Sequence, residues 1–137
     1  MITFDDISIR LGGKEILKNV SFHIEPNELA VLTGVSGSGK TTLLRLIAGI
    51  LKPDSGTVSV SSNRIGFVFQ DHRLLPWKTA LDNITLVLRA KGMTREQAHA
   101  QATSWLEMVG LEGYGNYYPS QLSGGMIQRV SIARAFA

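Results

Sequence analysis

The sequence predicts an α/β fold in which an N-terminal β-layer leads into a phosphate-binding loop and a helical part follows. The first observation is the pattern Gly, four residues, Gly-Lys-Thr at residues 34–41. A phosphate-binding loop lies between a strand and a helix, and the flanking segments fit this context. Residues 29–33 are an apolar stretch typical of a buried parallel strand, and residues 42–51 have helical spacing. The second observation is that strand patterns dominate before Leu74 and helix patterns dominate after it.

Four further segments have the composition of strands. They either alternate apolar and polar residues or are short apolar runs, and they span residues 2–10, 20–24, 57–60 and 65–69. Gly12-Gly13 is typical of a hairpin turn, so we expect the first two strands to form an antiparallel layer. Residues 52–56 contain proline and glycine, and we expect them to end the helix that follows the loop.

Two capping patterns predict helices in the second half of the chain. Thr79 precedes Asp82 by three residues, and Thr94 precedes Gln97 by the same spacing. The second of these helices has an apolar face that we expect to be core, formed by Ala98, Ala102, Trp105, Leu106 and Val109. The expected organisation is therefore a β-layer and loop core at about 1–74, a helical subdomain at about 75–120 and a last helix at 121–137.

The composition is that of one globular domain with enough apolar residues to build a core. Of the 137 residues, 44% are hydrophobic and none is cysteine, which excludes a disulfide framework and a thiolate metal site. No apolar run approaches the ~18 residues of a membrane helix, so we expect a soluble chain. The net charge of +3 is spread along the chain without a basic run and carries no argument about a nucleic-acid partner.

The glycine-rich run predicts a site for a nucleoside triphosphate. Its residues are Gly34, Val35, Ser36, Gly37, Ser38, Gly39, Lys40, Thr41 and Thr42. Glycines permit backbone angles at which successive N–H groups turn inward and wrap an anion, and the start of the following helix also favours negative charge. Lys40 would reach the β- and γ-phosphates, and the Thr41 hydroxyl would bind Mg²⁺. The alternative is a glycine-rich turn from strand to helix, without a ligand.

A second run, Leu122-Ser123-Gly124-Gly125, precedes an apolar helical pattern. By itself it predicts only a capped helix, because serine is a good N-cap and glycines allow a tight entry. Together, however, the phosphate loop, Gln70 after a predicted strand and this run resemble the nucleotide-binding subunit of ATP-binding cassette (ABC) transporters. The resemblance covers the whole chain and implies a P-loop NTPase fold of the ABC type, with an antiparallel β-layer and a helical subdomain.

The resemblance also implies roles for residues outside the loop. Ser123, Gly124 and Gly125 would contact the γ-phosphate held by the loop of a second ATP-binding subunit, in an ATP-dependent dimer. Gln70 would touch the Mg²⁺ and the attacking water. The other implied partners are transmembrane permease subunits and, indirectly, a solute-binding protein, with no nucleic acid. The implied location is peripheral, on the cytoplasmic face of the cell membrane.

Residues 71–78 look like the corresponding loop of the nitrate, sulfonate and taurine importers within this family. The function implied is an ATPase that powers import of such a small anionic solute. Two alternatives stay open: a nucleotide-binding regulatory module that does not hydrolyse ATP, and an ABC ATPase outside transport. DNA-repair and chromosome-associated ABC ATPases carry a long coiled coil between the two motifs, whereas no sustained heptads separate Lys40 from Ser123.

The sequence departs from the family pattern in three places. Leu11 stands where an aromatic residue often stacks on adenine, and Met126 stands where glutamine is commonest. The chain also ends at Ala137, before the apolar strand that carries the Mg²⁺-associated Asp and the catalytic Glu (Walker B), so no catalytic residue is identified. We therefore expect the N-terminal portion of a longer subunit, inactive alone, in which the apolar side chains of the strand at residues 29–33 are exposed: Leu29, Val31 and Leu32.

Overall fold

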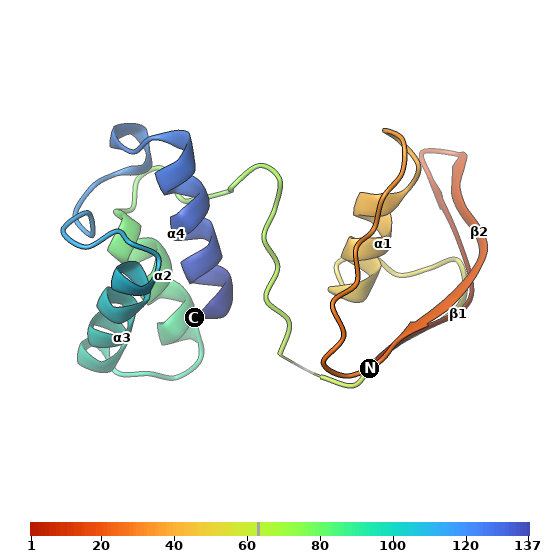
Figure 1. The fold of residues 1–137 in the computed structure, drawn as a ribbon, viewed down its shortest axis with the longest axis horizontal. Helices are drawn as coiled ribbons and strands as arrows, with labels where there is room; N and C mark the ends of the chain where they lie inside the picture. Colours follow the sequence, from red (N-terminus) through yellow and green to blue (C-terminus); the bar gives the residue numbers. More distant parts are fainter. Residues whose placement is uncertain (63) are drawn as a thin grey trace. The chain divides into compact units, whose positions relative to one another are not determined.

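The computed structural model describes residues 1–62 and 64–137, which divide into two compact units, Met1–Ile65 and Gly66–Ala137 (Figure 1). Each unit has its own hydrophobic core. The α/β class expected from the sequence is confirmed, because strands dominate the first unit and helices the second. The finer division at about residues 74 and 120 stays a prediction.

The first unit contains an antiparallel sheet of three strands in the order β2-β1-β3. The strands are β1 (Ile2–Leu11), β2 (Lys14–Ile24) and β3 (Ser55–Val60). Gly12 and Gly13 join β1 to β2 with φ angles of 59° and 79°, the left-handed conformation that a two-residue hairpin turn requires. The predicted hairpin is therefore confirmed, and its second strand begins earlier than residue 20.

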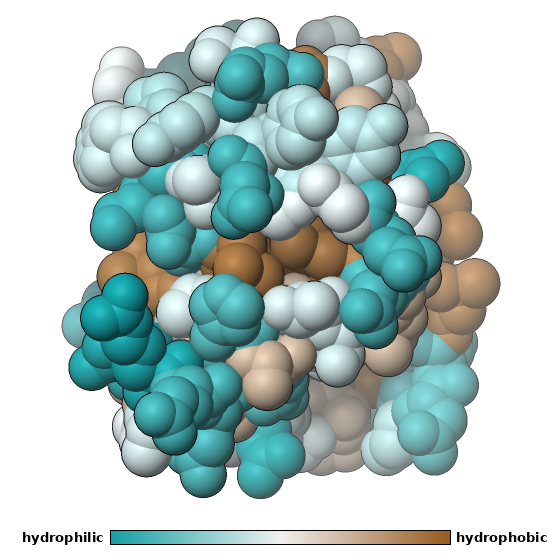
Figure 2. All heavy atoms as spheres, turned by 90° about the vertical axis from the view of Figure 1, so that its left-hand side faces the viewer, coloured by the Kyte–Doolittle hydropathy of each residue, from teal (hydrophilic) through white to brown (hydrophobic). Residues whose placement is uncertain are grey.

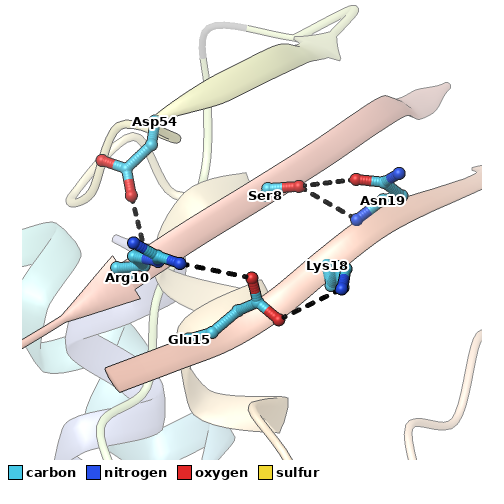
Figure 3. Close-up of polar contacts among 6 residues, drawn as sticks. All are labelled: Ser8, Arg10, Glu15, Lys18, Asn19 and Asp54. Carbon is cyan, nitrogen blue, oxygen red and sulfur yellow. Dashed lines mark hydrogen bonds and ion pairs between the residues drawn. The ribbon is translucent and has the colours of Figure 1, made fainter. Parts of the chain in front are cut away.

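One face of this sheet packs against the helix that follows the loop, α1 (Lys40–Ile47). The buried residues of this core are Phe4, Ile7, Ile9, Leu17, Leu43 and Leu46. Polar contacts link β1 to β2 and also link β1 to the bend that precedes β3 (Figure 3). The Arg10 backbone N–H donates to the Asp54 carboxylate at 2.7 Å, and the Ser8 hydroxyl lies 3.0 Å from Asn19 Oδ1.

The helix α1 ends earlier than the sequence suggested. Gly49 adopts a φ of 68° just beyond the Ala48 cap, and its N–H donates to the Leu46 carbonyl at 3.1 Å. The Ile50 N–H donates to the Arg45 carbonyl at 2.9 Å, which completes a Schellman motif. The expectation that residues 52–56 end the helix is therefore wrong. The left-handed conformation of Gly49 ends α1 earlier, because it lets the N–H groups of Gly49 and Ile50 bond to carbonyl groups of the last turn.

Two predicted strands, at residues 29–33 and 65–69, do not form among the residues that the structure describes. In the part of the chain that the structure describes, no strand pairs with either segment, and strand structure needs a hydrogen-bonded neighbour. The apolar side chains predicted to be buried are exposed instead, with 91% exposure at Leu29 and 78% at Val31, and Leu32 is exposed as well. The separate expectation that these three side chains are exposed in this chain is therefore confirmed.

The second unit is a cluster of helices. It consists of α2 (Ala80–Ala90), α3 (Arg95–Met108), the short 3₁₀ helix η1 (Pro119–Gln121) and α4 (Gly124–Phe136). The Thr79 hydroxyl caps α2 by accepting from the Asp82 N–H, and Thr94 and Gln97 form the predicted capping box at α3. None of the helices in the described ranges is long and apolar enough to span a membrane.

Residues from all three α-helices of the second unit meet in one core. Ala98, Ala102 and Leu106 of α3 are buried as predicted, and Ile84, Leu88 and Val130 are fully buried beside them. Asn83 is also buried, and its side-chain amide bonds to backbone groups of the preceding turn: the Leu75 N–H and the carbonyls of Leu75, Lys78 and Thr79. This amide therefore fixes the entry to α2.

Replacing Leu88 with alanine is expected to destabilise the second unit by about 2–5 kcal/mol, because the fully buried site would lose apolar contacts and keep a cavity. Leu86→Ala on the same helix is the control, since Leu86 is 49% exposed. Urea unfolding followed by circular dichroism measures both changes. Equal losses of stability in the two variants would contradict the assignment of this core.

Candidate functional site

The predicted phosphate loop connects an extended segment to the start of α1 in the first unit. Gly37 and Gly39 have φ angles of 80° and 92°, in the region that only glycine occupies readily, and the N–H of Ser38 donates to the Val35 carbonyl at 3.3 Å. Gly34 also has a positive φ. The loop therefore makes the tight turn that the glycine spacing predicted.

Strand β2 holds one end of this loop in place. A Cβ atom on Gly39 would lie 2.7 Å from the Leu17 Cδ2 atom and 3.3 Å from the Ile16 carbonyl oxygen. The φ of 92° favours glycine at this position, and a larger residue would also require the end of the Leu17 side chain to shift. The contribution of Ile16 and Leu17 to the site was not predicted, because nothing in their sequence pattern distinguishes them from other core strand residues.

The Lys40 side chain folds back over the loop. Its Nζ donates to the carbonyl oxygens of Gly34 and Val35, each at 2.7 Å, and lies 3.3 Å from the Ser38 hydroxyl. These contacts hold an ammonium group against the loop at the start of a helix. A bound phosphate would offer this ammonium a stronger, charge-assisted partner than neutral carbonyl groups.

The start of α1 is suited to an anion. Its N-cap is Gly39, so no side chain accepts from the first N–H groups, and the first turn carries no acidic residue. These N–H groups and the helix dipole together favour a negatively charged ligand. The Thr41 side chain lies exposed in this turn, whereas Thr42 is buried.

The residues present fit a magnesium ion that arrives with a nucleotide. A hydroxyl such as that of Thr41 is a hard oxygen ligand, and Mg²⁺ usually keeps several waters and takes its other ligands from substrate phosphates. Among the described residues no group of three or more His, Cys, Asp or Glu side chains forms a metal site. These residues therefore suit a magnesium ion that is bound jointly by the protein and the nucleotide phosphates, rather than one whose ligands all come from the protein.

The other predicted site residues lie in the second unit. Gln70 is exposed and follows a segment without helix or strand structure at residues 66–69. Ser123 is the N-cap of α4, and its hydroxyl accepts from the Met126 N–H at 3.3 Å, which confirms the helix cap expected from the sequence.

The two glycines after this cap face open space. A Cβ atom on Gly124 or Gly125 would meet nothing within 4 Å, and neither residue has a positive φ. Neither packing nor backbone conformation within the chain explains why glycine stands at these positions. Glycine here leaves the start of α4 accessible to a large group from outside.

A separate pocket of about 300 Å³ lies in the helical unit, and none of the predicted site residues lines it. Its apolar lining comes from Leu81, Leu106 and Leu111, and its polar lining includes His99 and Glu107. Figure 2 looks onto the side where Figure 1 labels α2 and α3, and it shows apolar residues in a hollow between hydrophilic ones.

The chain is similar to known ATP-binding proteins. The sequence profile of the family described as "ABC transporter" matches residues 17–137. The nitrate import ATP-binding protein NrtD of Synechocystis is 44% identical over 92% of this chain and 50% of its own length. The taurine import ATP-binding protein TauB of Chromobacterium violaceum is 46% identical over 99% of this chain and 56% of its length. The cell division ATP-binding protein FtsE of Escherichia coli is 40% identical over 98% of this chain and 68% of its length.

Solved structures agree with the sequence comparisons. The dimeric structure of a post-hydrolysis state of the ATP-binding cassette MJ0796, bound to ADP and Pi, is 36% identical to this chain with a TM-score of 0.91. It is matched over 100% of this chain and 69% of its own length. The chain thus spans about half the length of the nitrate and taurine relatives and roughly two thirds of this cassette.

Proposed function

Because this chain belongs to the ABC transporter family, we propose that it is the ATP-binding part of a subunit that powers an importer of a small anionic solute, such as nitrate, sulfonate or taurine. The observation that carries the proposal is the loop before α1, where left-handed glycines, a helix start without a side-chain cap and the Lys40 ammonium coincide. These features suit the phosphate groups of ATP. The names of the nitrate and taurine relatives support the solute class.

In the proposed site, residues 34–42 would hold the nucleotide, the Thr41 hydroxyl would bind Mg²⁺, and Gln70 is proposed as a further Mg²⁺ contact on the family resemblance alone. The ion would neutralise charge on the phosphates. Phosphoryl transfer depends mostly on positioning and charge stabilisation, and Lys40 supplies part of the latter. ATP binding by the complete subunit would drive closure of two such subunits, and hydrolysis would allow them to reopen.

The second ATP-binding subunit would complete the site with Ser123, Gly124 and Gly125. The open space around the two glycines supports this arrangement, and the related cassette bound to ADP and Pi is described as dimeric. The further partners proposed are permease subunits and, through them, a solute-binding protein. Such an assembly would place the subunit at the cytoplasmic face of the membrane.

The similarity to the cell division protein FtsE favours a second candidate, an ABC ATPase that works outside solute import. The two candidates share the nucleotide site and differ in the partner. Stimulation of ATP turnover by a loaded solute-binding protein in reconstituted vesicles would support the importer. A rate of ATP turnover that no anionic solute changes would favour the second candidate.

Replacing Lys40 with alanine is expected to weaken ATP binding by roughly ten- to a hundredfold, because a charge-assisted contact worth ~1.5–3 kcal/mol is lost. Titration of the complete subunit with a fluorescent ATP analogue measures the dissociation constant. Lys52→Ala is the control, since Lys52 is exposed beyond the end of α1. An unchanged dissociation constant in Lys40→Ala would remove the nucleotide-site assignment.

A further inference from the structure

The chain segment that carries Gln70 is attached to α4 on both sides of this residue. Gly66 lies four residues before Gln70, and His72 and Arg73 follow it closely. Both attachments are made to the last two turns of α4, the helix that Ser123 caps. Gln70 therefore lies on a short span whose ends are fixed to one rigid element.

The first attachment is a close backbone approach. A Cβ atom added to Gly66 would lie 2.5 Å from the carbonyl oxygen of Ala135 and 3.2 Å from its carbonyl carbon. Gly66 is not among the glycines with positive φ, so its backbone angle does not account for the residue. The close contact with α4 explains why glycine stands at position 66, because any larger residue would push the segment away from the helix.

The second attachment is a set of hydrogen bonds from side chains of α4. The Arg134 guanidinium donates to the carbonyl oxygens of His72 and Arg73, at 3.0 Å and 2.9 Å. The Ser131 hydroxyl lies 3.2 Å from the same His72 oxygen. The planar guanidinium has donors in a fixed fork, so a single side-chain orientation holds both successive carbonyl groups.

The turn held by Arg134 has an unfavourable backbone conformation. Arg73 has a φ of 48°, which costs energy for a residue other than glycine, and its own guanidinium lies 4.6 Å from the centre of the Phe69 ring. Partial burial lowers the pKa of Arg134, although an arginine remains charged at neutral pH. The contacts of Arg134 and Phe69 thus stabilise a turn that the backbone alone would not keep.

We propose that Arg134 is a positioning residue that holds Gln70 in a fixed relation to α4. This inference rests on the proposed function, in which Gln70 acts near the nucleotide and the start of α4 meets the second subunit. Ser123 and Arg134 are eleven residues apart on one helix, about 16 Å along its axis. A displacement of α4 when the second subunit docks would therefore carry the Gln70 segment with it.

The test measures ATP dissociation constants and kcat for the complete subunit assembled with its permease partners. Arg134→Met keeps an apolar stem and removes the fork, and it is expected to lower kcat by about tenfold or more while changing the ATP dissociation constant by less than about twofold. In a Gln70→Ala background the same substitution is expected to change kcat by less than about twofold, because Arg134 acts through Gln70.

Lys91→Met is the matched control. Lys91 Nζ also donates to a backbone carbonyl at the end of α4, that of the C-cap Ala137, at 2.7 Å, and this bond does not involve residues 66–73. Its loss is expected to leave kcat within about twofold. Where Arg134→Met folds poorly, Arg134→Lys keeps the charge and one hydrogen bond, and the same non-additivity with Gln70→Ala is expected.

Two outcomes would overturn the inference. Independent, multiplicative effects of the Arg134 and Gln70 substitutions would show that Arg134 only stabilises the fold. A Gln70→Ala variant with normal kcat would show that the position of Gln70 does not affect turnover, so Arg134 could not act through it. The nucleotide site is tested separately by Lys40→Ala and would not be affected by this result.

Discussion

Replacing Ser123 with arginine is expected to abolish ATP-induced dimerisation and turnover of the complete subunit, while its affinity for ATP as a monomer stays within about twofold. The Ser123 side chain is exposed at the start of α4, and the space beside Gly124 and Gly125 is open. A long arginine side chain would fill this space and block the approach of the nucleotide held by the second subunit. Loss of the serine cap adds about 1 kcal/mol of local destabilisation.

Analytical ultracentrifugation with ATP under non-hydrolysing conditions measures this dimerisation. Ser104→Arg is the control, because it places the same side chain at an exposed position of α3. Comparison with Ser123→Asn, which keeps an N-cap side chain, separates loss of the cap from steric blockage. Persistence of the dimer in Ser123→Arg would mean that the run at residues 122–125 serves only to cap a helix.

A polypeptide of residues 1–137 expressed alone is expected to aggregate or to melt over a broad range, and to release phosphate at the background rate. Leu29 and Val31 are 91% and 78% exposed, and each large apolar side chain left in water forgoes about 1.5–3 kcal/mol. That loss is substantial beside the ~5–15 kcal/mol that stabilises a whole domain. Catalysis is expected to fail separately, because no carboxylate identified in residues 1–137 would both hold Mg²⁺ from a second side and polarise the attacking water.

Light scattering, differential scanning calorimetry and a phosphate-release assay measure these properties. Replacing Leu29 and Val31 with threonine is expected to raise the solubility of the polypeptide. Replacing Leu86 and Met108 with glutamine is the control, since these residues are exposed on α2 and α3. A soluble polypeptide with a sharp transition and turnover that depends on Ser123 would contradict this account.

Features that depend only on neighbouring residues could be predicted from the sequence. The hairpin turn at Gly12-Gly13 and the capping box of Thr94 and Gln97 formed as predicted. The same is true of the tight loop before α1 and of the serine cap of α4. Each depends on a positive φ or on a hydrogen bond over three residues, so its cause is visible in a window of a few residues.

Features whose partners lie far away in the chain depend on how the chain folds. An apolar run such as residues 29–33 becomes a strand only where another strand supplies hydrogen bonds, and in the described residues none does. The spacing predicts Gly39 only as a turn residue, whereas in the structure it also lies close to Ile16 and Leu17 of β2. Arg134 meets the carbonyls of His72 and Arg73 across about sixty residues of sequence. No local pattern predicts such a contact, because it arises only when α4 packs beside the segment that carries Gln70.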